Sequence, residues 1–156
     1  MVTLPPPSFE HLCNLAVEVG SPIEVGITSM GMRRMVPILG GTIEGPAMRG
    51  RVLAGGADFQ LILAGGTQAH LDARYVVELD DGSRLFVMNR ALRVASPEIA
   101  EQLRQGQQVD PDQVYFRCQP TIEAANPAWQ WLHGCQIIGT GQRLPDKVIL
   151  SLYRVL

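Results

Sequence analysis

Charged residues are scarce in this chain, and lysine is almost absent. Of the 156 residues 18% are charged, and the basic ones are twelve arginines and a single lysine, Lys147. Disordered chains, coiled coils and long amphipathic bundles need more charge, so these classes are excluded. The formal net charge is −2. No strong field therefore attracts nucleic acid or an anionic membrane, and we expect neither as a partner.

Cysteines and long apolar runs are also few. Cys13, Cys118 and Cys135 are widely spaced and form no C-x-x-C pair, which is typical of reduced, partly buried thiols. No apolar run approaches the roughly 18 residues of a membrane helix. The start of the chain has neither the basic nor the apolar region of a signal peptide. These absences predict a cytoplasmic protein.

Glycine and proline are abundant, with 16 and 11 residues, and they separate short runs rich in Val, Ile, Leu, Tyr and Phe. Such runs are typical of strands. Asp81-Gly82 indicates a tight hairpin, while Ser96-Pro97 followed by Gly106 predicts one short helix near residues 97–105. The strands are expected at 12–19, 35–39, 50–53, 58–63, 73–79, 84–89, 114–118, 135–140 and 148–155.

Nine short strands and one helix predict an all-β fold. A single antiparallel β-barrel is favoured over a sandwich, because closure removes exposed strand edges. Residues 1–156 are expected to form one barrel domain, with the Pro-rich residues 1–8 as a flexible N-terminus.

Several segments, in this order and at this spacing, resemble the family of small proteins called domain of unknown function 3237. The likeness covers about residues 9–155, and it implies a single antiparallel barrel that is calycin-like in outline, with no established activity. Phe59 stands where the resemblance implies Trp, Leu63 and Gly65 where it implies a charged pair, and His133-Gly134 where it implies Asn-Arg. The segments that carry the likeness are 34–46, 50–53, 55–60, 72–75, 81–82, 115–117, 131–132, 139–141 and 143–145, with Pro120 and Glu123.

Polar residues alternate with apolar ones along several predicted strands, which places them on one face. We predict that this face lines the barrel interior or mouth, because polar groups that converge in an apolar cavity form a binding site. Alternatively, these residues face solvent or form ion pairs that fix strand register. The face holds Glu44, Asp58, Asp72, Glu123, Arg74, Arg93 and Arg117, with Gln60, Asn89 and Tyr115 beside them.

These side chains suit acid–base chemistry on a carbonyl compound. A carboxylate kept from water has a raised pKa and can move a proton near neutral pH, and an arginine can stabilise charge that develops on a carbonyl oxygen. The catalytic candidates are the bases Asp58 and Asp72 with Glu44 behind them, the arginines Arg74 and Arg117, and the proton donor His133. The candidates for substrate binding are Gln60, Asn89, Arg93, Tyr115, Glu123 and Trp131.

The sequence therefore predicts a cofactor-independent acid–base enzyme of the isomerase, cyclase or lyase type. Its substrate would be a small carbonyl-bearing organic molecule in a barrel pocket. The alternatives are a non-catalytic binding or carrier barrel and an oligomeric structural or interaction protein. We expect no cofactor and no metal site, since His70-x-Asp72 has no third ligand at a fixed spacing.

The apolar residues opposite the polar face are expected on the outside of the barrel. There they need cover, which predicts a homo-oligomer, with a dimer favoured. These residues are Phe59, Leu61, Tyr75, Val77, Phe116 and Ile122.

Overall fold

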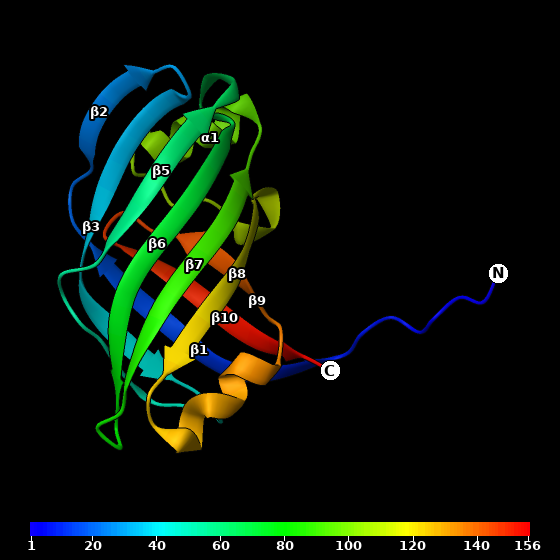
Figure 1. The fold of residues 1–156 in the computed structure, drawn as a ribbon. Coiled ribbons are helices and arrows are strands. Elements are labelled where there is room, and N and C mark those ends of the chain that lie inside the picture. Colours follow the sequence, from blue (N-terminus) through cyan, green and yellow to red (C-terminus); the bar gives the residue numbers. More distant parts are fainter.

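The computed structural model describes residues 1–156, and ten strands dominate it. Residues 1–8 precede the first strand and form neither helix nor strand; they extend away from the rest of the molecule (Figure 1). The strands are β1 (Phe9–Val19), β2 (Ile23–Thr28), β3 (Gly31–Glu44), β4 (Gly50–Val52), β5 (Ala57–Leu63), β6 (Gln68–Leu79), β7 (Arg84–Val94), β8 (Tyr115–Ala124), β9 (Ile137–Arg143) and β10 (Lys147–Val155).

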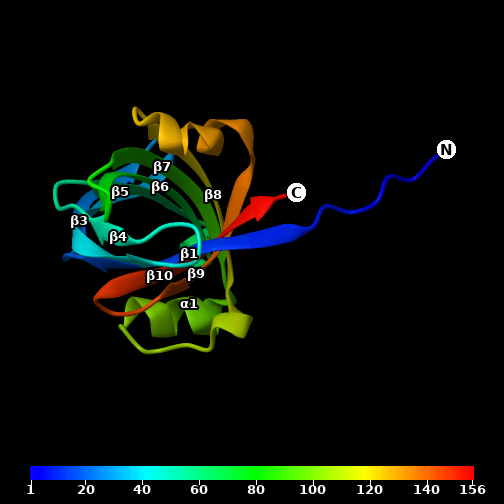
Figure 2. The same cartoon turned by 90° about the horizontal axis from the view of Figure 1, so that it is seen from below.

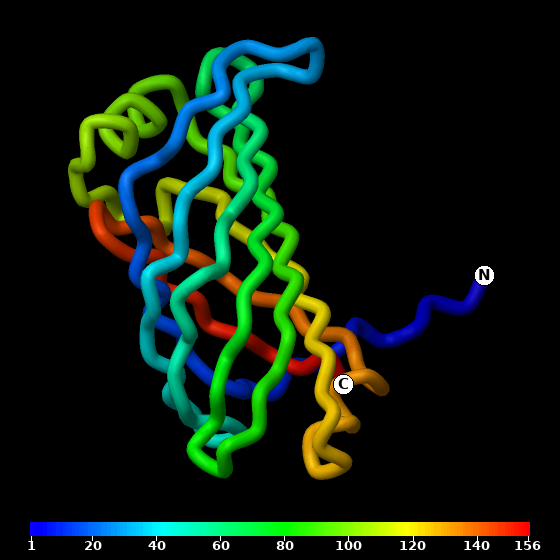
Figure 3. The backbone as a smooth tube through the Cα atoms, turned by 60° about the vertical axis from the view of Figure 1, so that its left-hand side comes forward, coloured from blue at the N-terminus to red at the C-terminus, as the bar shows by residue number.

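Eight of these strands close into an antiparallel barrel, which confirms the predicted fold class. Each strand of the barrel pairs with its neighbour along the chain, from β5 through β6, β7, β8 and β9 to β10. β1 closes the ring because it pairs with β10 on one side and with β3 on the other. The remaining two strands lie off this ring: β4 bridges β3 and β6, while β2 pairs with β3 alone (Figures 1 and 3).

The predicted helix is present as α1 (Pro97–Arg104), and the hydroxyl of Ser96 caps it by accepting a hydrogen bond of 3.3 Å from the Ile99 N–H. Three short 3₁₀ segments were not predicted: η1 (Ala64–Gly66), η2 (Pro111–Gln113) and η3 (Pro127–Gly134). In the end-on view, α1 and η3 lie on opposite sides of the barrel (Figure 2). No helix is both long and apolar enough to cross a membrane.

The barrel interior is divided into a filled end and a hollow end. Along β7, Leu85 and Val87 point into a core of 23 buried residues, whereas Asn89 and Arg93 line a pocket. The same change occurs on β6, where Val77 and Leu79 belong to the core alone and Leu71 reaches the pocket wall. The fold therefore leaves space at the end of the barrel farthest from the β6–β7 hairpin.

Candidate functional site

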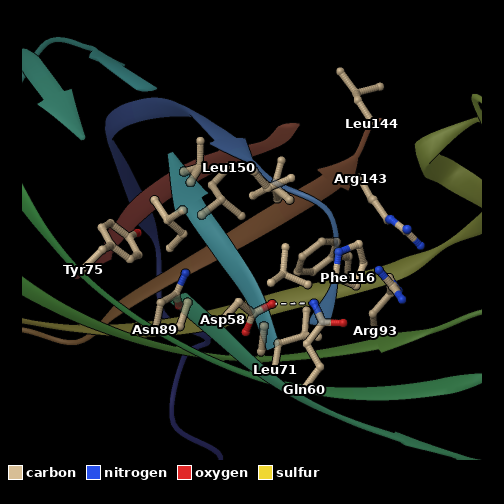
Figure 4. A pocket seen from close by; sticks show the side chains of 18 of the residues that line it. Asp58, Gln60, Leu71, Tyr75, Asn89, Arg93, Phe116, Arg143, Leu144 and Leu150 are labelled. Carbon is tan, nitrogen blue, oxygen red and sulfur yellow. Dashed lines mark hydrogen bonds between the residues drawn. The ribbon is translucent and has the colours of Figure 1, made fainter. Parts of the chain in front are cut away.

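The pocket is enclosed by the eight strands of the barrel and by the turn between β9 and β10. It is lined by 21 residues, of which 12 are hydrophobic, so a few polar groups converge in an apolar cavity (Figure 4). The space open to the centre of a water molecule is about 100 Å³, and one water needs about 10–15 Å³ of such space. The pocket therefore accommodates several waters or a compact organic molecule.

Cross-strand pairing places the polar residues of the pocket in successive rows. Directly paired residues point to the same face of a sheet, so Asp58 on β5, Ala73 on β6 and Asn89 on β7 form one row. The neighbouring row contains Arg34 on β3 and Gln60 on β5. Two neighbouring rows, each with one charged side chain and one amide, thus lie on the inner wall.

A chain of hydrogen bonds joins these rows. The Nε of Arg34 donates to Oε1 of Gln60 at 2.7 Å. Nε2 of Gln60 donates in turn to Oδ2 of Asp58 at 2.6 Å (Figure 4). Gln60 is only 7% exposed. The Gln60 amide therefore fixes the Asp58 carboxyl group in one orientation without neutralising it.

Three buried polar atoms of the pocket have no hydrogen-bond partner. They are Oδ1 of Asp58, the phenol oxygen of Tyr75 and Oδ1 of Asn89. Buried polar groups in folded proteins are almost always hydrogen-bonded, and leaving one unpaired costs about 1–3 kcal/mol. That all three line the same cavity identifies the groups that would bind a polar ligand.

Asp58 is the only acidic residue that lines the pocket. Burial raises the pKa of its carboxyl group above the usual value, while the Gln60 hydrogen bond, the backbone of Asp72 and the guanidinium groups of Arg93 and Arg34 partly offset this effect. Burial also raises the pKa of the Tyr75 phenol, so that group stays protonated. The pocket thus pairs a proton-exchanging carboxyl with a neutral phenol donor.

Only some of the residues expected on the polar face are brought together here. Asp58, Gln60, Asn89 and Arg93 line the pocket. The other expected residues do not: these are Glu44, Asp72, Arg74, Tyr115, Arg117, Glu123, Trp131 and His133.

The expectation that Asp72 and Arg74 share a face with Asp58 is wrong, and the pairing register explains why. Asp58 pairs with Ala73, and Asp72 pairs with Phe59, so even-numbered residues point inward on β5 and outward on β6. Asp72 and Arg74 form an exposed ion pair of 3.5 Å on the outer surface.

The apolar residues expected on the outside divide in the same way. Phe59 is 47% exposed on the outer face, whereas four others are buried in the core. The expectation that these four face outward is wrong: they are Tyr75, Val77, Phe116 and Ile122.

Strand β8 has its polar residues on the outer face. Tyr115 is 52% exposed, and the Arg117 guanidinium lies 5.1 Å from the centre of its ring. Glu44 and Glu123 are likewise exposed. Because Phe116 points into the pocket, its neighbours Tyr115 and Arg117 point to solvent. The expectation that Tyr115 and Arg117 face inward and Phe116 outward is therefore wrong.

His133 and Trp131 lie on η3, outside the pocket. Nε2 of His133 accepts a hydrogen bond of 3.1 Å from the Ala124 N–H, and the Arg154 guanidinium lies 5.5 Å from the Trp131 ring centre. Both interactions hold η3 against the barrel. The structure contains no group of three or more His, Cys, Asp or Glu side chains placed to hold a metal ion.

Three polar residues of the pocket were not among the predicted site residues: Arg34, Tyr75 and Arg143. All three lie in segments that carry the family resemblance: Arg34 begins segment 34–46, Tyr75 ends segment 72–75, and Arg143 begins segment 143–145. An inward assignment of the odd-numbered residues of β6 would have found Tyr75.

Comparison with known proteins gives a consistent result at the level of sequence. Residues 7–155 match the family described as "Protein of unknown function (DUF3237)". A UPF0311 protein of Rhodopseudomonas palustris is 35% identical over 147 residues, 94% of this chain and 95% of that protein. A UPF0311 protein of Clostridium acetobutylicum is 33% identical over 149 residues, with 95% and 94% covered.

Solved structures show the same barrel. A conserved protein of unknown function from Rhodopseudomonas palustris has a TM-score of 0.92 at 34% identity, with 99% of this chain and 100% of that chain covered. A beta-barrel like protein from Acinetobacter baumannii has a TM-score of 0.86 at 36% identity, with both chains fully covered (100%). A structure described as an enzyme from Penicillium herquei has a TM-score of 0.73 at 19% identity, also over 100% of both chains. At that identity the likeness concerns the fold alone.

Proposed function

Because the chain belongs to the DUF3237 family, whose description names no reaction, we propose a function from the pocket itself: cofactor-independent acid–base catalysis on a small carbonyl-bearing organic molecule. The reaction would be an isomerisation, a cyclisation or an elimination. All three begin with transfer of a proton to or from carbon or oxygen, which requires a positioned acid or base and no redox group.

The observation that carries this proposal is the Asp58 carboxyl group. It lies in an apolar pocket, Gln60 fixes one of its oxygens at 2.6 Å, and the other oxygen is buried without a partner. Its raised pKa moves proton exchange toward neutral pH.

The proposed reaction starts when Oδ1 of Asp58 takes a proton from the carbon next to the substrate carbonyl. The C–H bond breaks, its electron pair forms the C=C bond of an enolate, and negative charge gathers on the carbonyl oxygen. A hydrogen bond donated by the Tyr75 phenol would stabilise that charge, because a neutral donor in a dry site acts strongly on a developing anion. Return of the proton to a different atom completes an isomerisation, and loss of a β-substituent completes an elimination.

The Penicillium herquei structure agrees with a catalytic barrel of this shape. It is described as an enzyme and shares the fold over the whole chain. Fold likeness alone does not transfer a reaction, so the support for the proposal comes from Asp58 and its surroundings.

Hydrogen–deuterium exchange tests the proposal directly. The protein is incubated in D₂O with a panel of ketones, 1,3-dicarbonyl compounds and α,β-unsaturated ketones, and loss of the α-proton signal is followed by NMR. We expect Asp58→Asn to reduce the exchange rate at least about 100-fold, the lower range for loss of a general base. Asp72→Asn is the matched control, because it makes the same change on the outer surface, and it should keep the wild-type rate.

The carrier alternative is supported by the apolar walls, since 12 of the 21 lining residues are hydrophobic. A carrier would bind members of the panel without exchanging their protons. If every compound exchanges with wild-type protein no faster than in buffer, the catalytic proposal is contradicted and the carrier is favoured. The same conclusion follows if Asp58→Asn exchanges protons as fast as wild type.

A further inference from the structure

Three arginines lie along the wall of the pocket, and the proposed proton transfer at Asp58 does not need all of them. Arg34 is on β3, Arg93 on β7 and Arg143 at the end of β9. Figure 4 shows Arg93 and Arg143 on the same side of the cavity, beyond Gln60 as seen from Asp58. With Asp58 as the only acid in the wall, charged arginines leave the pocket with an excess of two positive charges.

No carboxylate lies within the 4 Å of an ion pair from these arginines, although Glu24 lies opposite Arg34 across the strands and its charge, with that of Asp58, acts on Arg34. All five ion pairs of the structure involve other residues, although Arg93 is only 9% exposed. Burial and repulsion from Arg143 and Arg34 lower the pKa of Arg93 to about 10, with Asp58 offsetting part of the effect. Buried charges are normally paired, so Arg93, a buried cation with no ion-pair partner, is a cost to the fold.

The arrangement suits an anionic group of an organic ligand. Guanidinium groups bind carboxylates through two parallel hydrogen bonds. Arg93 lies four residues along β7 from Asn89, about 13 Å at the usual rise per residue, so Arg93 is offset along the barrel from the row that holds Asp58, whereas Arg34 lies in the row next to it. The apolar side chains of Leu71 and Ala91, which pair with each other in the row between Asn89 and Arg93 and line the pocket, would contact the body of the ligand between these two positions.

We propose that Arg34, Arg93 and Arg143 form a carboxylate-binding subsite, and that the substrate is therefore an oxo acid: a small molecule with an apolar body, a carbonyl group near Asp58 and a carboxylate at the arginines. This inference rests on the proposed function insofar as both concern the same pocket. The subsite binds and orients the substrate; Asp58 performs the chemistry.

The test measures binding of sodium benzoate by calorimetry and by the shift it causes in the melting temperature, with benzamide as the neutral molecule of the same shape. We expect wild-type protein to bind benzoate at least tenfold more tightly than benzamide. Arg143→Gln and Arg93→Gln should each weaken benzoate binding at least tenfold. Arg90→Gln is the matched control, because Arg90 is exposed on the outer face of the same strand as Arg93, and it should bind benzoate like wild type.

A second measurement separates binding from folding. If Arg93 binds a ligand, removing its unpaired charge leaves the unliganded melting temperature unchanged or raises it, while the rise caused by benzoate disappears. A lower melting temperature of unliganded Arg93→Gln, with benzoate binding intact in Arg143→Gln, overturns the subsite and makes the arginines structural.

Two further results would overturn the assignment of the ligand. Equal binding of benzoate and benzamide excludes recognition of the charge. Sulfate that binds as tightly as benzoate, with the same dependence on Arg143, shows a general anion site in place of a carboxylate site.

The Asp58→Asn variant keeps the two proposals distinguishable. It should bind benzoate at least as tightly as wild type, because it removes the one negative charge from the wall, even though proton exchange is lost. Benzoate binding without Asp58-dependent exchange supports the subsite and contradicts the enzyme; exchange without selective benzoate binding does the reverse.

Discussion

Asp58 is held in a state that costs the folded protein stability. Its carboxyl group is buried among apolar residues, which raises its pKa, and the Gln60 hydrogen bond and the charges of Arg93 and Arg34 offset this only in part. The folded protein therefore binds this proton more tightly than the unfolded chain, in which the pKa of an Asp is about 3.9. By linkage, this group's effect on the free energy of unfolding becomes unfavourable as the pH rises from the unfolded pKa through the higher folded pKa.

This sign gives a prediction about stability. Asp58→Asn should be more stable than wild type at pH 7, and the gain should shrink as the pH falls toward the unfolded pKa of about 3.9, below which the carboxyl is protonated in both the folded and the unfolded state. Each kcal/mol raises the melting temperature of a domain of this size by about 2–4 °C. Thermal unfolding between pH 4 and 8 measures it. Asp72→Asn, which loses only an exposed ion pair, should show no such gain, and an Asp58→Asn variant that melts lower than wild type at pH 7 contradicts the argument.

Which residues line the pocket depends on the pairing register between strands, and the alternation of polar and apolar residues along one strand does not determine that register. Along each strand, alternate residues lie on opposite faces, and this pattern correctly placed Asp58 and Gln60 on the same face. Which set of alternate residues points inward on the next strand depends on the number of residues in the intervening turn, here η1 with Ala64 and Gly65 at positive φ. The pairing of Asp58 with Ala73 then places Asp72 on the outer face. This register cannot be predicted from the residue pattern of either strand alone.

The long strand β3 is built around two glycines that the sequence presents as a turn. Gly40 and Gly41 lie inside the strand, and Gly41 pairs with Val17 of β1 and with Val52 of β4. Its φ is +145°, and a Cβ at this position would overlap the carbonyl oxygen of Ala16. Glycine is therefore used here for close approach of neighbouring strands at the closure of the barrel, which explains why β3 is longer than predicted.

Gly41→Ala should consequently destabilise the barrel. The unfavourable φ costs about 1–2 kcal/mol, and the overlap with backbone adds about 1–3 kcal/mol, so the melting temperature should fall by at least about 5 °C. Gly82→Ala is the matched control, because Gly82 also has positive φ, +83°, but nothing lies within 4 Å of its added Cβ. Thermal unfolding of both variants separates the two effects, because Gly41→Ala has both the Cβ overlap and the positive φ, whereas Gly82→Ala has the positive φ alone. Equal falls in melting temperature would show that the closely packed strands tolerate the Cβ at position 41.

The barrel has one open edge, at β2, and an apolar outer surface beside it. β2 pairs with β3 alone, and Val25 and Ile27 on it are 71% and 90% exposed. Ile23, Met35 and Phe59 are joined in one cross-strand row over β2, β3 and β5. Open edges and contiguous apolar patches favour association between chains. The closed barrel and its helix were predictable from turn spacing, but this edge was not, because the short strand β2 lies among turn signals and packs little of its surface.

We propose that a second copy of the chain covers this row and its edge, which makes the protein a homodimer. Phe59→Lys should shift the protein toward monomer, because it places a charge in the apolar row, and Asp72, which pairs with residue 59 across the strands, keeps the new lysine compatible with folding. Phe86→Lys is the matched control: Phe86 is 37% exposed on β7 and pairs with Glu123, so it receives the same charge opposite an acid but far from β2. Sedimentation velocity at several protein concentrations gives the masses, with circular dichroism to check the fold.

A wild-type monomer at all concentrations contradicts the dimer, and dissociation by Phe86→Lys but not by Phe59→Lys moves the interface to the other side of the barrel.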